Sequence, residues 1–252
     1  MHAAVLGAYE EQVRTAIADL AERKAVERIW AKDASLWKSV PEHQAIIRNS
    51  LGWLSAAAFV RSQEPDLARC AAEVNRAGFT HGVLLGMGGS SLCAEVLGHT
   101  FGAAAGHPRL LVLDTTDPAG VQAVEQAVDL PRTLFIVASK SGTTPEIAAF
   151  QRYFLARARA GEQFVAITDP GTALERAARE GRFRHTFLNP ADIGGRYSAL
   201  SLFGMVPATL MGLDVLRLLE RGERMAQACR AGAPGDNPGL ALGATLGALA
   251  RA

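Results

Sequence analysis

The sequence predicts an α/β protein: a doubly wound, mainly parallel five-stranded sheet with N-terminal helices before it and C-terminal helices after it. Three observations predict this class. Five short apolar runs between residues 81 and 188 resemble buried parallel strands. Each run is followed by Gly, Ser, Thr, Asp or Pro and then by a stretch of helical periodicity, the pattern of repeated βα units. No strand pattern precedes Thr80.

The first eighty residues read as helices. Apolar residues recur at helical spacing over about residues 3–25, and again over residues 43–60, where they share one face. A third helix is predicted over residues 65–76. It stops at Gly78, a residue type that favours the left-handed conformation found just after helix ends. Residues 1–79 are therefore predicted to form an N-terminal helical region.

The predicted sheet belongs to an α/β domain that spans residues 80–195. Ligands of such folds bind beyond the carboxyl ends of the strands, so we expect function in the loops that follow the five apolar runs. The five predicted strands are residues 81–86, 109–113, 133–138, 162–167 and 184–188.

The remainder, residues 196–252, reads as a helical segment. Helices are predicted over 198–213 and 215–231, followed by a turn over 232–238. The stretch 197–213 is uncharged, but it contains two glycines and a proline and is shorter than the roughly 20 residues of a bilayer span, so it predicts a buried core helix. The last stretch, 239–252, has helical character without a closing Gly or Pro. We expect it to break off before a further domain.

Composition narrows the class of partner. The 26 Lys and Arg residues nearly balance 25 Asp and Glu, and a net charge of +1 disfavours a nucleic-acid partner, which usually selects a basic patch. The N-terminus carries no secretion signal, which, with the absence of a membrane span, predicts no membrane partner. Three widely spaced cysteines without a C-x-x-C pattern are typical of reduced thiols in a cytoplasmic protein.

The first loop with chemical potential, residues 86–91, reads Gly-Met-Gly-Gly-Ser-Ser. Glycines let backbone N–H groups approach an anion, and the N-terminus of the helix expected from Leu92 adds about half a positive charge. The loop lacks the third glycine of the dinucleotide fingerprint and the G-K-[ST] of a P-loop. Asp114 stands where a ribose-binding acid would be. A nicotinamide site and a purely structural glycine turn both stay open.

The loop after the third predicted strand, residues 139–144, reads Ser-Lys-Ser-Gly-Thr-Thr. Pro145 suits the first helical position with Thr144 as N-cap, or Thr143 and Glu146 form a capping box. A cap uses one hydroxyl, so the other hydroxyls and the free N–H groups can hold a tetrahedral oxyanion such as phosphate. A structural cap alone is the alternative. Two anion-suited loops at neighbouring strand ends predict one phosphorylated ligand.

A third loop, residues 194–198, reads Gly-Gly-Arg-Tyr-Ser. Its two glycines permit a tight turn before Arg196, whose planar guanidinium can engage substrate oxygens. An arginine after such a turn more often pairs with a surface carboxylate.

Together, Gly86-Met-Gly-Gly-Ser90, Ser139-Lys-Ser-Gly-Thr-Thr144 and Gly194-Gly-Arg-Tyr-Ser198 resemble the signature of the glucose-6-phosphate isomerase family. The resemblance covers roughly residues 80–252, the first sugar-isomerase (SIS-type) domain and the start of the region C-terminal to it. Residues 28–38 are also similar to the isomerase half of bifunctional transaldolase–isomerase chains.

The resemblance implies interconversion of glucose 6-phosphate and fructose 6-phosphate through a cis-enediol, in glycolysis and gluconeogenesis. It implies an enzyme without metal or organic cofactor that is a homodimer at full length. It assigns phosphate binding to Ser139, Lys140, Ser141, Thr143 and Thr144, sugar binding to Gly88, Gly89, Ser90 and Gly195, and the enediolate to Arg196.

Two features depart from the family pattern. The family usually carries Thr-Phe where this chain has Ser141-Gly142, so the phosphate hydroxyl is kept and the sugar-side wall differs. Isomerisation also needs a base and a ring-opening acid–base group, which the family takes from a later Glu, His and Lys. After Arg196 this sequence has four acids, no His and no Lys. We therefore expect this chain alone to bind sugar phosphate without isomerising it.

Two other functions remain open at this point. One is a non-catalytic SIS-type module that senses a sugar phosphate. The other, less favoured, is an NAD-dependent oxidoreductase, which the loop at residues 86–91 and Asp114 support and the hydroxyl-rich third loop opposes.

Overall fold

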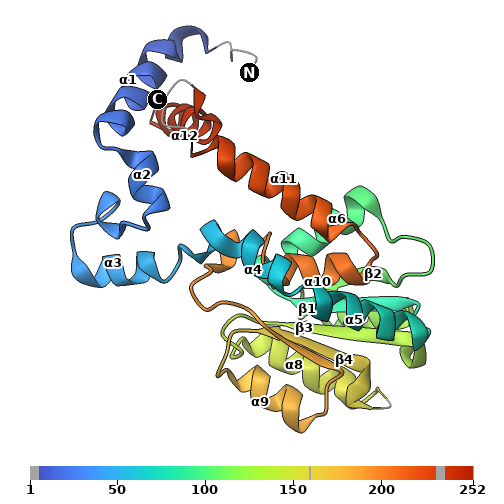
Figure 1. Cartoon of the computed structure of the whole chain (residues 1–252). Coiled ribbons are helices and arrows are strands. Elements are labelled where there is room, and N and C mark those ends of the chain that lie inside the picture. Colours follow the sequence, from blue (N-terminus) through green and yellow to red (C-terminus); the bar gives the residue numbers. More distant parts are fainter. Residues whose placement is uncertain (1–5, 159, 231–235, 252) are drawn as a thin grey trace.

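The computed structural model describes residues 6–158, 160–230 and 236–251. It confirms the predicted class: five parallel strands form one sheet in the order β2-β1-β3-β4-β5, with helices on both faces (Figure 1). The strands are β1 (His81–Gly86), β2 (Arg109–Leu113), β3 (Thr133–Ala138), β4 (Phe164–Thr168) and β5 (His185–Leu188).

The fourth strand begins two residues later than the sequence predicts. Residues 161–163 form a 3-10 turn instead, and the Gln163 side-chain amide donates to the carbonyls of Leu130 and Thr133 at 2.7 and 3.1 Å. These bonds hold the turn against the start of β3. The strand itself is fully buried, as expected for a central parallel strand.

Alternate side chains of β1, β3 and β4 point into two separate cores. One core joins the sheet to α5 (Glu64–Arg76), α6 (Leu92–Phe101) and α10 (Leu202–Leu210). The other lies under α7 (Pro118–Gln126), α8 (Pro145–Leu155) and α9 (Ala173–Glu180). In the second core the Phe135 ring stacks on Phe154 and Phe164, with ring centroids 4.6 and 5.1 Å apart.

The helices that follow the neighbouring strands β1 and β3 lie on opposite faces of the sheet: α6 packs in the first core and α8 in the second. The strand order therefore reverses direction between them. In open α/β sheets this reversal leaves a crevice beyond the carboxyl ends of the two strands, where ligands bind.

Three N-terminal helices, α1 (Glu10–Glu22), α2 (Ala25–Trp30) and α3 (Pro41–Arg48), extend away from the sheet (Figure 1). The next helix, α4 (Ala56–Ser62), contributes Val60 to the first core. Near the far end, α12 (Pro238–Leu249) lies against α1, burying Val13 with Ala244 and Ala248. The long helix α11 (Val215–Ala228) runs between the two ends of the molecule.

The prediction of one helix over residues 43–60 is wrong. Helix α3 ends at Arg48, and a 3-10 turn, Gly52–Ser55, precedes α4. Leu51 forms an antiparallel bridge with Ile193, and the Gly52 N–H donates to the Asp192 carbonyl at 2.8 Å. These backbone groups therefore bond to the loop that follows β5 and do not form the hydrogen bonds of a continuous helix.

Other boundaries shift for local reasons. The helix predicted over 3–25 is divided at Lys24, which has a positive φ of 50°, and residues 3–5 lie outside the described residues. Helix α10 begins at Leu202 rather than at 198, since the Ser201 hydroxyl accepts from the Phe203 N–H at 3.3 Å and caps it there. The predicted burial of α10 is confirmed.

Helix α11 ends at Ala228 rather than at 231, and residues 232–235 of the predicted turn lie outside the described residues, as does residue 252. Across the described residues, no helix is both long and apolar enough to span a bilayer.

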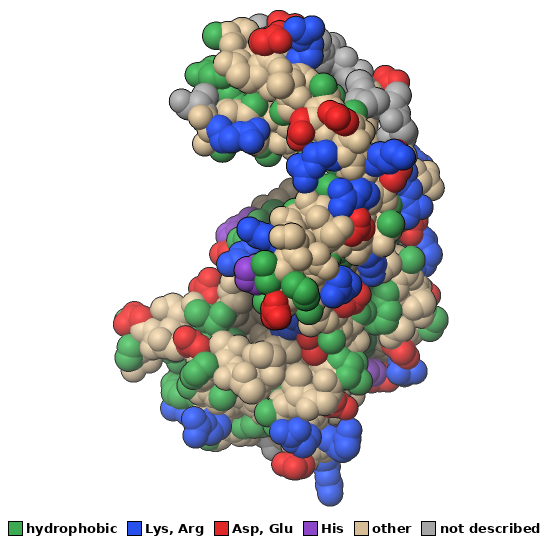
Figure 2. Space-filling view, turned by 90° about the vertical axis from the view of Figure 1, so that its left-hand side faces the viewer, with side chains coloured by type: hydrophobic (Ala, Val, Ile, Leu, Met, Phe, Trp, Pro, Cys, Tyr) green, Lys and Arg blue, Asp and Glu red, His purple; other side chains and the backbone are tan. Residues whose placement is uncertain are grey.

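Figure 2 shows side chains of both charges interspersed over one face of the molecule, with a hollow below the end that carries α1 and α12. Further 3-10 turns lie at Gly7–Tyr9, Ala34–Leu36, Gly88–Ser90, Leu130–Arg132 and Gly195–Tyr197.

Candidate functional site

The candidate loops begin side by side at one edge of the sheet. Gly86 at the end of β1 pairs with Ala138 at the end of β3, and Ala138 in turn pairs with Ile167 in β4. Thr168 pairs with Leu188, the last residue of β5. The loops that leave β1, β3, β4 and β5 therefore start next to one another, at the crevice that the strand order creates.

Residues 139–144, here called the phosphate loop, turn their hydroxyls on one another. The buried Ser139 Oγ accepts from the Gly142 N–H at 3.1 Å and shares a hydrogen bond of 3.0 Å with Thr144 Oγ1. The Ser141 Oγ accepts from the Thr143 N–H at 3.3 Å and from the Thr143 hydroxyl at 3.1 Å. The loop is thus a compact cluster of hydroxyl groups bonded to one another.

Thr144 occupies the predicted N-cap position of α8, with Pro145 directly after it. Its hydroxyl, however, forms no capping bond to the helix, and the alternative capping box is not formed either. The first N–H groups of an α-helix have no partner within the helix and carry partial positive charge. Within the described residues, this helix end has no side-chain cap, which leaves it suited to an anion.

Gly142 is a glycine for two structural reasons. Its φ is +65°, and a Cβ at this position would lie 2.6 Å from the Cβ of Thr172. The phosphate loop is therefore in close contact with the first turn of α9, where Thr172 serves as N-cap. A side chain at residue 142 would therefore enter the space that Thr172, in the loop after β4, occupies.

The Lys140 side chain bonds to the segments that follow two other strands. Its Nζ forms an ion pair with Asp169 Oδ2 and donates to the Ala191 carbonyl at 2.7 Å. Asp169, only 8% exposed, directly follows β4. Burial raises the pKa of this carboxyl, although Lys140 and the neighbouring Asn189 amide lower it. Asp169 was not among the residues predicted from the sequence; its place at the end of a predicted strand was the available signal.

The loop after β1 contacts the loop after β5 directly. A Cβ on Gly89 would lie 2.0 Å from the Gly195 carbonyl oxygen, so the two backbones meet where no side chain fits. The buried Ser198 hydroxyl lies against both carbonyls, 2.8 Å from that of Gly89 and 2.7 Å from that of Gly195. Gly88 has a positive φ of 56°. Two of the predicted sugar-site glycines thus have a structural reason to be glycine.

Gly195 and Arg196 are different. A Cβ on Gly195 would meet nothing within 4 Å among the described residues, and its φ is not positive, so neither packing nor conformation requires glycine there. Arg196 is exposed, and its guanidinium forms no hydrogen bond or ion pair with the described part of the chain. Pairing with a surface carboxylate, the ordinary alternative, is not seen. Ser90 is half-buried in the Gly88–Ser90 turn, next to the contact between Gly89 and Gly195.

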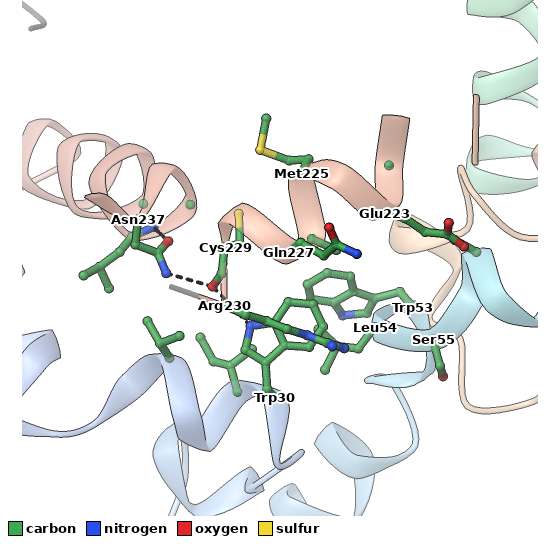
Figure 3. Close-up of a pocket in the computed structure, with 18 of the residues that line it drawn as sticks. Trp30, Trp53, Leu54, Ser55, Glu223, Met225, Gln227, Cys229, Arg230 and Asn237 are labelled. Carbon is green, nitrogen blue, oxygen red and sulfur yellow. Dashed lines mark hydrogen bonds between the residues drawn. The ribbon is translucent and has the colours of Figure 1, made fainter. Parts of the chain in front are cut away.

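A cavity of about 560 Å³ lies elsewhere, between α2, α4, α11 and α12 (Figure 3). Its walls are mostly apolar, with the indoles of Trp30 and Trp53 prominent. The Arg230 guanidinium stacks on Trp30, 4.1 Å from the ring centroid, and the Asn237 amide donates to the Cys229 carbonyl at 2.7 Å. Among the described residues of its lining, Ser55 supplies the only hydroxyl side chain, and the N-terminus of α12 is already capped by Asn237, whose Oδ1 accepts from the Leu240 N–H at 2.9 Å. The cavity is therefore not the candidate anion site.

No three His, Cys, Asp or Glu side chains of the described residues gather into a group that could hold a metal ion. The cysteines, Cys70, Cys93 and Cys229, are free. Burial raises the pKa of the Cys70 thiol to about 12 and also raises that of Cys93, so neither is a ready nucleophile.

Comparison with protein families finds one match: the phosphoglucose isomerase model covers residues 73–248. A glucose-6-phosphate isomerase of Thermosynechococcus vestitus is 36% identical over 243 residues, which is 90% of this chain and 43% of that protein. One from Citrifermentans bemidjiense is 33% identical over 171 residues, 65% of this chain and 32% of that protein. The chain thus spans less than half the length of these relatives.

Solved structures share the fold. A hypothetical protein from Thermus thermophilus superposes with a TM-score of 0.77 at 24% identity, covering 95% of this chain and 55% of that one. A glucose-6-phosphate isomerase from Chlamydia trachomatis gives 0.70 at 23% identity, covering 95% and 50%. A tagatose-6-phosphate ketose/aldose isomerase from Escherichia coli gives 0.54 at 16%, covering 76% and 52%.

Proposed function

This chain belongs to the phosphoglucose isomerase family, and we propose that it forms the substrate-holding part of an enzyme that interconverts glucose 6-phosphate and fructose 6-phosphate. The observation that carries the proposal is the phosphate loop: four hydroxyls and a helix end without a side-chain cap, beside the β1/β3 crevice. The names of the relatives supply the substrate. Family membership also speaks against the nicotinamide alternative.

In this proposal each of the three loops has its own role. Ser139, Ser141, Thr143 and Thr144 exchange their mutual hydrogen bonds for bonds to the phosphate oxygens, and the α8 N–H groups add partial positive charge. The sugar lies over residues 88–90 and Gly195, since a Cβ on Gly88 or on Gly195 would meet nothing within 4 Å among the described residues.

Arg196 stabilises the negative charge that develops on the enediolate oxygens. Its guanidinium is free of other partners in the described structure, exposed, and carried on the turn that packs against Gly89. A planar fork of donors matches two neighbouring oxygens, which a lysine cannot do. A donor aimed at charge that develops only in the transition state raises kcat rather than ground-state affinity.

The proton-transfer groups are proposed to lie outside these 252 residues. Of the acids that come after Arg196, Asp214 caps α11 by accepting from the Arg217 N–H at 2.9 Å, Glu220 pairs with Arg224, and Glu223 pairs with Arg61 at 2.8 Å. Each of these three carboxylates already has a structural partner. The proposal therefore assigns the base and the ring-opening group to a further part of a longer enzyme.

The proposal has further parts that rest on the family alone. The reaction belongs to glycolysis and gluconeogenesis in the cytoplasm, the full-length enzyme is a homodimer, and no metal or organic cofactor takes part. The division into an N-terminal helical region (1–79), an SIS-type domain (80–195) and a helical segment (196–252) ahead of a second SIS domain is part of the same proposal.

Titration calorimetry on this chain tests the proposal. Glucose 6-phosphate should bind, glucose and NAD should not, and inorganic phosphate should compete with glucose 6-phosphate. A coupled assay on the chain, purified free of host isomerase, should detect no turnover near the ordinary enzymatic rate of about 10 s⁻¹. Binding of NAD, or equal binding of glucose and its phosphate, would overturn the proposal. Turnover at that rate would overturn the assignment of the base to another part of the enzyme.

A further inference from the structure

Three strand ends meet at one ammonium group. Lys140, in the phosphate loop after β3, forms its ion pair with Asp169 after β4 and donates to the carbonyl of Ala191 after β5 at 2.7 Å. Ala191 lies in the segment that leads to Arg196. The Asp169 N–H returns a bond to the Lys140 carbonyl at 3.3 Å. This link joins the loop proposed to hold the phosphate to the loop proposed to face the reacting carbons.

We propose that Asp169 is a positioning residue of this site, which, through Lys140, locks the phosphate loop to the segment that carries Arg196. The inference rests on the proposed function, since it concerns how the same site is held. It assigns Lys140 a structural task, in place of the direct phosphate contact that the family resemblance implies.

The surroundings of Asp169 favour positioning over ligand binding. The residue is 8% exposed, and its second oxygen, Oδ1, is buried without a hydrogen bond in the described structure. A buried carboxylate close to a phosphate site also repels the ligand's charge. A group that weakens anion binding by charge and is costly to bury has no evident use here except to fix the geometry of its neighbours.

Other contacts also hold these loops in place. Among the described residues, the Lys140–Asp169 pair is the ion pair that joins the loops to one another. The Ser139 N–H donates to the Ile167 carbonyl at 3.0 Å, and Gly142 packs on Thr172. The Asn189 side chain is fully buried and accepts from the Leu202 N–H at 3.2 Å. These bonds fix where each loop begins. Between the phosphate loop and the segment around Ala191, the Lys140 side chain supplies the bridge.

The two roles of Lys140 predict opposite effects of Asp169→Asn. If Lys140 binds the phosphate directly, removing the carboxylate frees the ammonium and removes a repulsive charge, so glucose 6-phosphate binds more tightly. If Asp169 locks the loops, the same change lets them move apart, and glucose 6-phosphate binds more weakly. The sign of the change in affinity therefore decides between them.

The experiment compares Asp169→Asn, Lys140→Met and the double variant by calorimetry with glucose 6-phosphate. Asp66→Asn is the matched control, because Asp66 pairs with Arg69 at 2.7 Å on the exposed face of α5. We expect each single variant to lose on the order of tenfold in affinity, as when the support of a binding site is loosened. The double variant should lose no more than either single variant, since both break the same link.

Two measurements separate positioning from general damage. Amide hydrogen exchange of the ligand-free chain should accelerate at residues 140–144 and 189–196 in Asp169→Asn, while the core strands stay protected. The sequence has only four lysines, so NMR signals of the ammonium groups can be assigned by substitution. The Lys140 signal should shift in Asp169→Asn and stay in place when glucose 6-phosphate is added to the unsubstituted chain.

Unchanged or tighter binding by Asp169→Asn would overturn the inference, as would a Lys140 signal that moves on addition of ligand. If Asp169→Asn fails to fold, Lys140→Met decides by hydrogen exchange in the ligand-free chain, because both roles of Lys140 predict weaker binding by that variant. If the unsubstituted chain binds no glucose 6-phosphate, the proposed function fails, and the exchange measurement still decides whether Asp169 locks the loops.

Discussion

Replacing Ser141 and Thr144 together by Ala should weaken the binding of glucose 6-phosphate without unfolding the chain. Ser141 lies in the middle of the phosphate loop and is exposed, and Thr144 lies at its end and is half-buried. Thr144 caps α8 by its backbone position only, so removing its hydroxyl leaves the hydrogen bonds of the helix intact. The substitution therefore acts on the ligand and on three internal hydrogen bonds of the loop.

The magnitude is set by the bonds exchanged. A hydrogen bond to a charged acceptor contributes about 1.5–3 kcal/mol, and a neutral one about 0.5–1.5 kcal/mol. In the free loop both hydroxyls already have neutral partners, at 3.0 Å for Thr144 and 3.1 Å for Ser141. The central values leave about 1 kcal/mol for each exchange. Two exchanges give about 2 kcal/mol, which corresponds to a roughly thirtyfold rise in Kd.

Calorimetric titration with glucose 6-phosphate measures the change. Ser62→Ala with Thr100→Ala is a matched control, because it removes the same atoms from hydroxyls that bond backbone carbonyls at 2.6 Å in helices away from the site. Chemical unfolding should give the same midpoint for both double variants. An affinity that stays within threefold of the unsubstituted chain, or a control that loses as much, would refute the assignment of the phosphate to this loop.

Three further predictions concern the fold. Phe135→Ala removes the ring at the centre of the stacked core under α8 and should lower the free energy of unfolding by about 3–5 kcal/mol in urea titrations; a loss below about 1 kcal/mol would contradict the packing. Cys70 is 1% exposed, and burial raises its pKa to about 12. Its thiol should therefore resist alkylation at about pH 8 until the chain is unfolded, whereas the half-buried Cys229 should react. Equal alkylation rates for the two thiols would show that the core around Cys70 opens. The hydrogen bond from His185, 2.9 Å from Glu73, holds the pKa of Glu73 below its ordinary value of 4.5. Ionised Glu73 therefore contributes stability above that value and loses it as the pH falls through the lowered pKa, so Glu73→Gln should destabilise the chain at neutral pH and converge with the unsubstituted chain in acid.

The fold was predictable from the sequence where short-range signals were strong. Buried parallel strands are nearly continuous apolar runs, and the limits of β1, β2 and β3 match those runs directly. Gly78, with a φ of 73°, marks the end of α5 as expected. The error over residues 43–60 arose because Leu51 and Gly52 bond to Ile193 and Asp192, more than a hundred residues later. No local pattern contains that partner.

The site was predictable as a set of loops but not as a set of contacts. The hydroxyl cluster and the glycine turns are readable in the sequence, because their residue types are unusual at strand ends. Asp169 was missed, because a single acid after a strand has no distinguishing pattern. Its importance arises only when the sheet places the ends of β3, β4 and β5 together around Lys140. For the same reason, Lys140 could not be separated from the phosphate ligands by sequence alone.

The contact between Gly89 and Gly195 explains why the loops form one signature. A side chain on Gly89 would enter the carbonyl of Gly195, and the Ser198 hydroxyl lies on both backbones at once. Gly89 therefore cannot gain a Cβ without displacing the loop that follows β5. The phosphate loop obeys a similar constraint at Gly142, where Thr172 occupies the space. The exposed guanidinium of Arg196 and the open space at Gly195 are free of such constraints. Packing therefore accounts for the glycines between the loops, and the two residues that it leaves unexplained, Gly195 and Arg196, are those that the proposed substrate would contact.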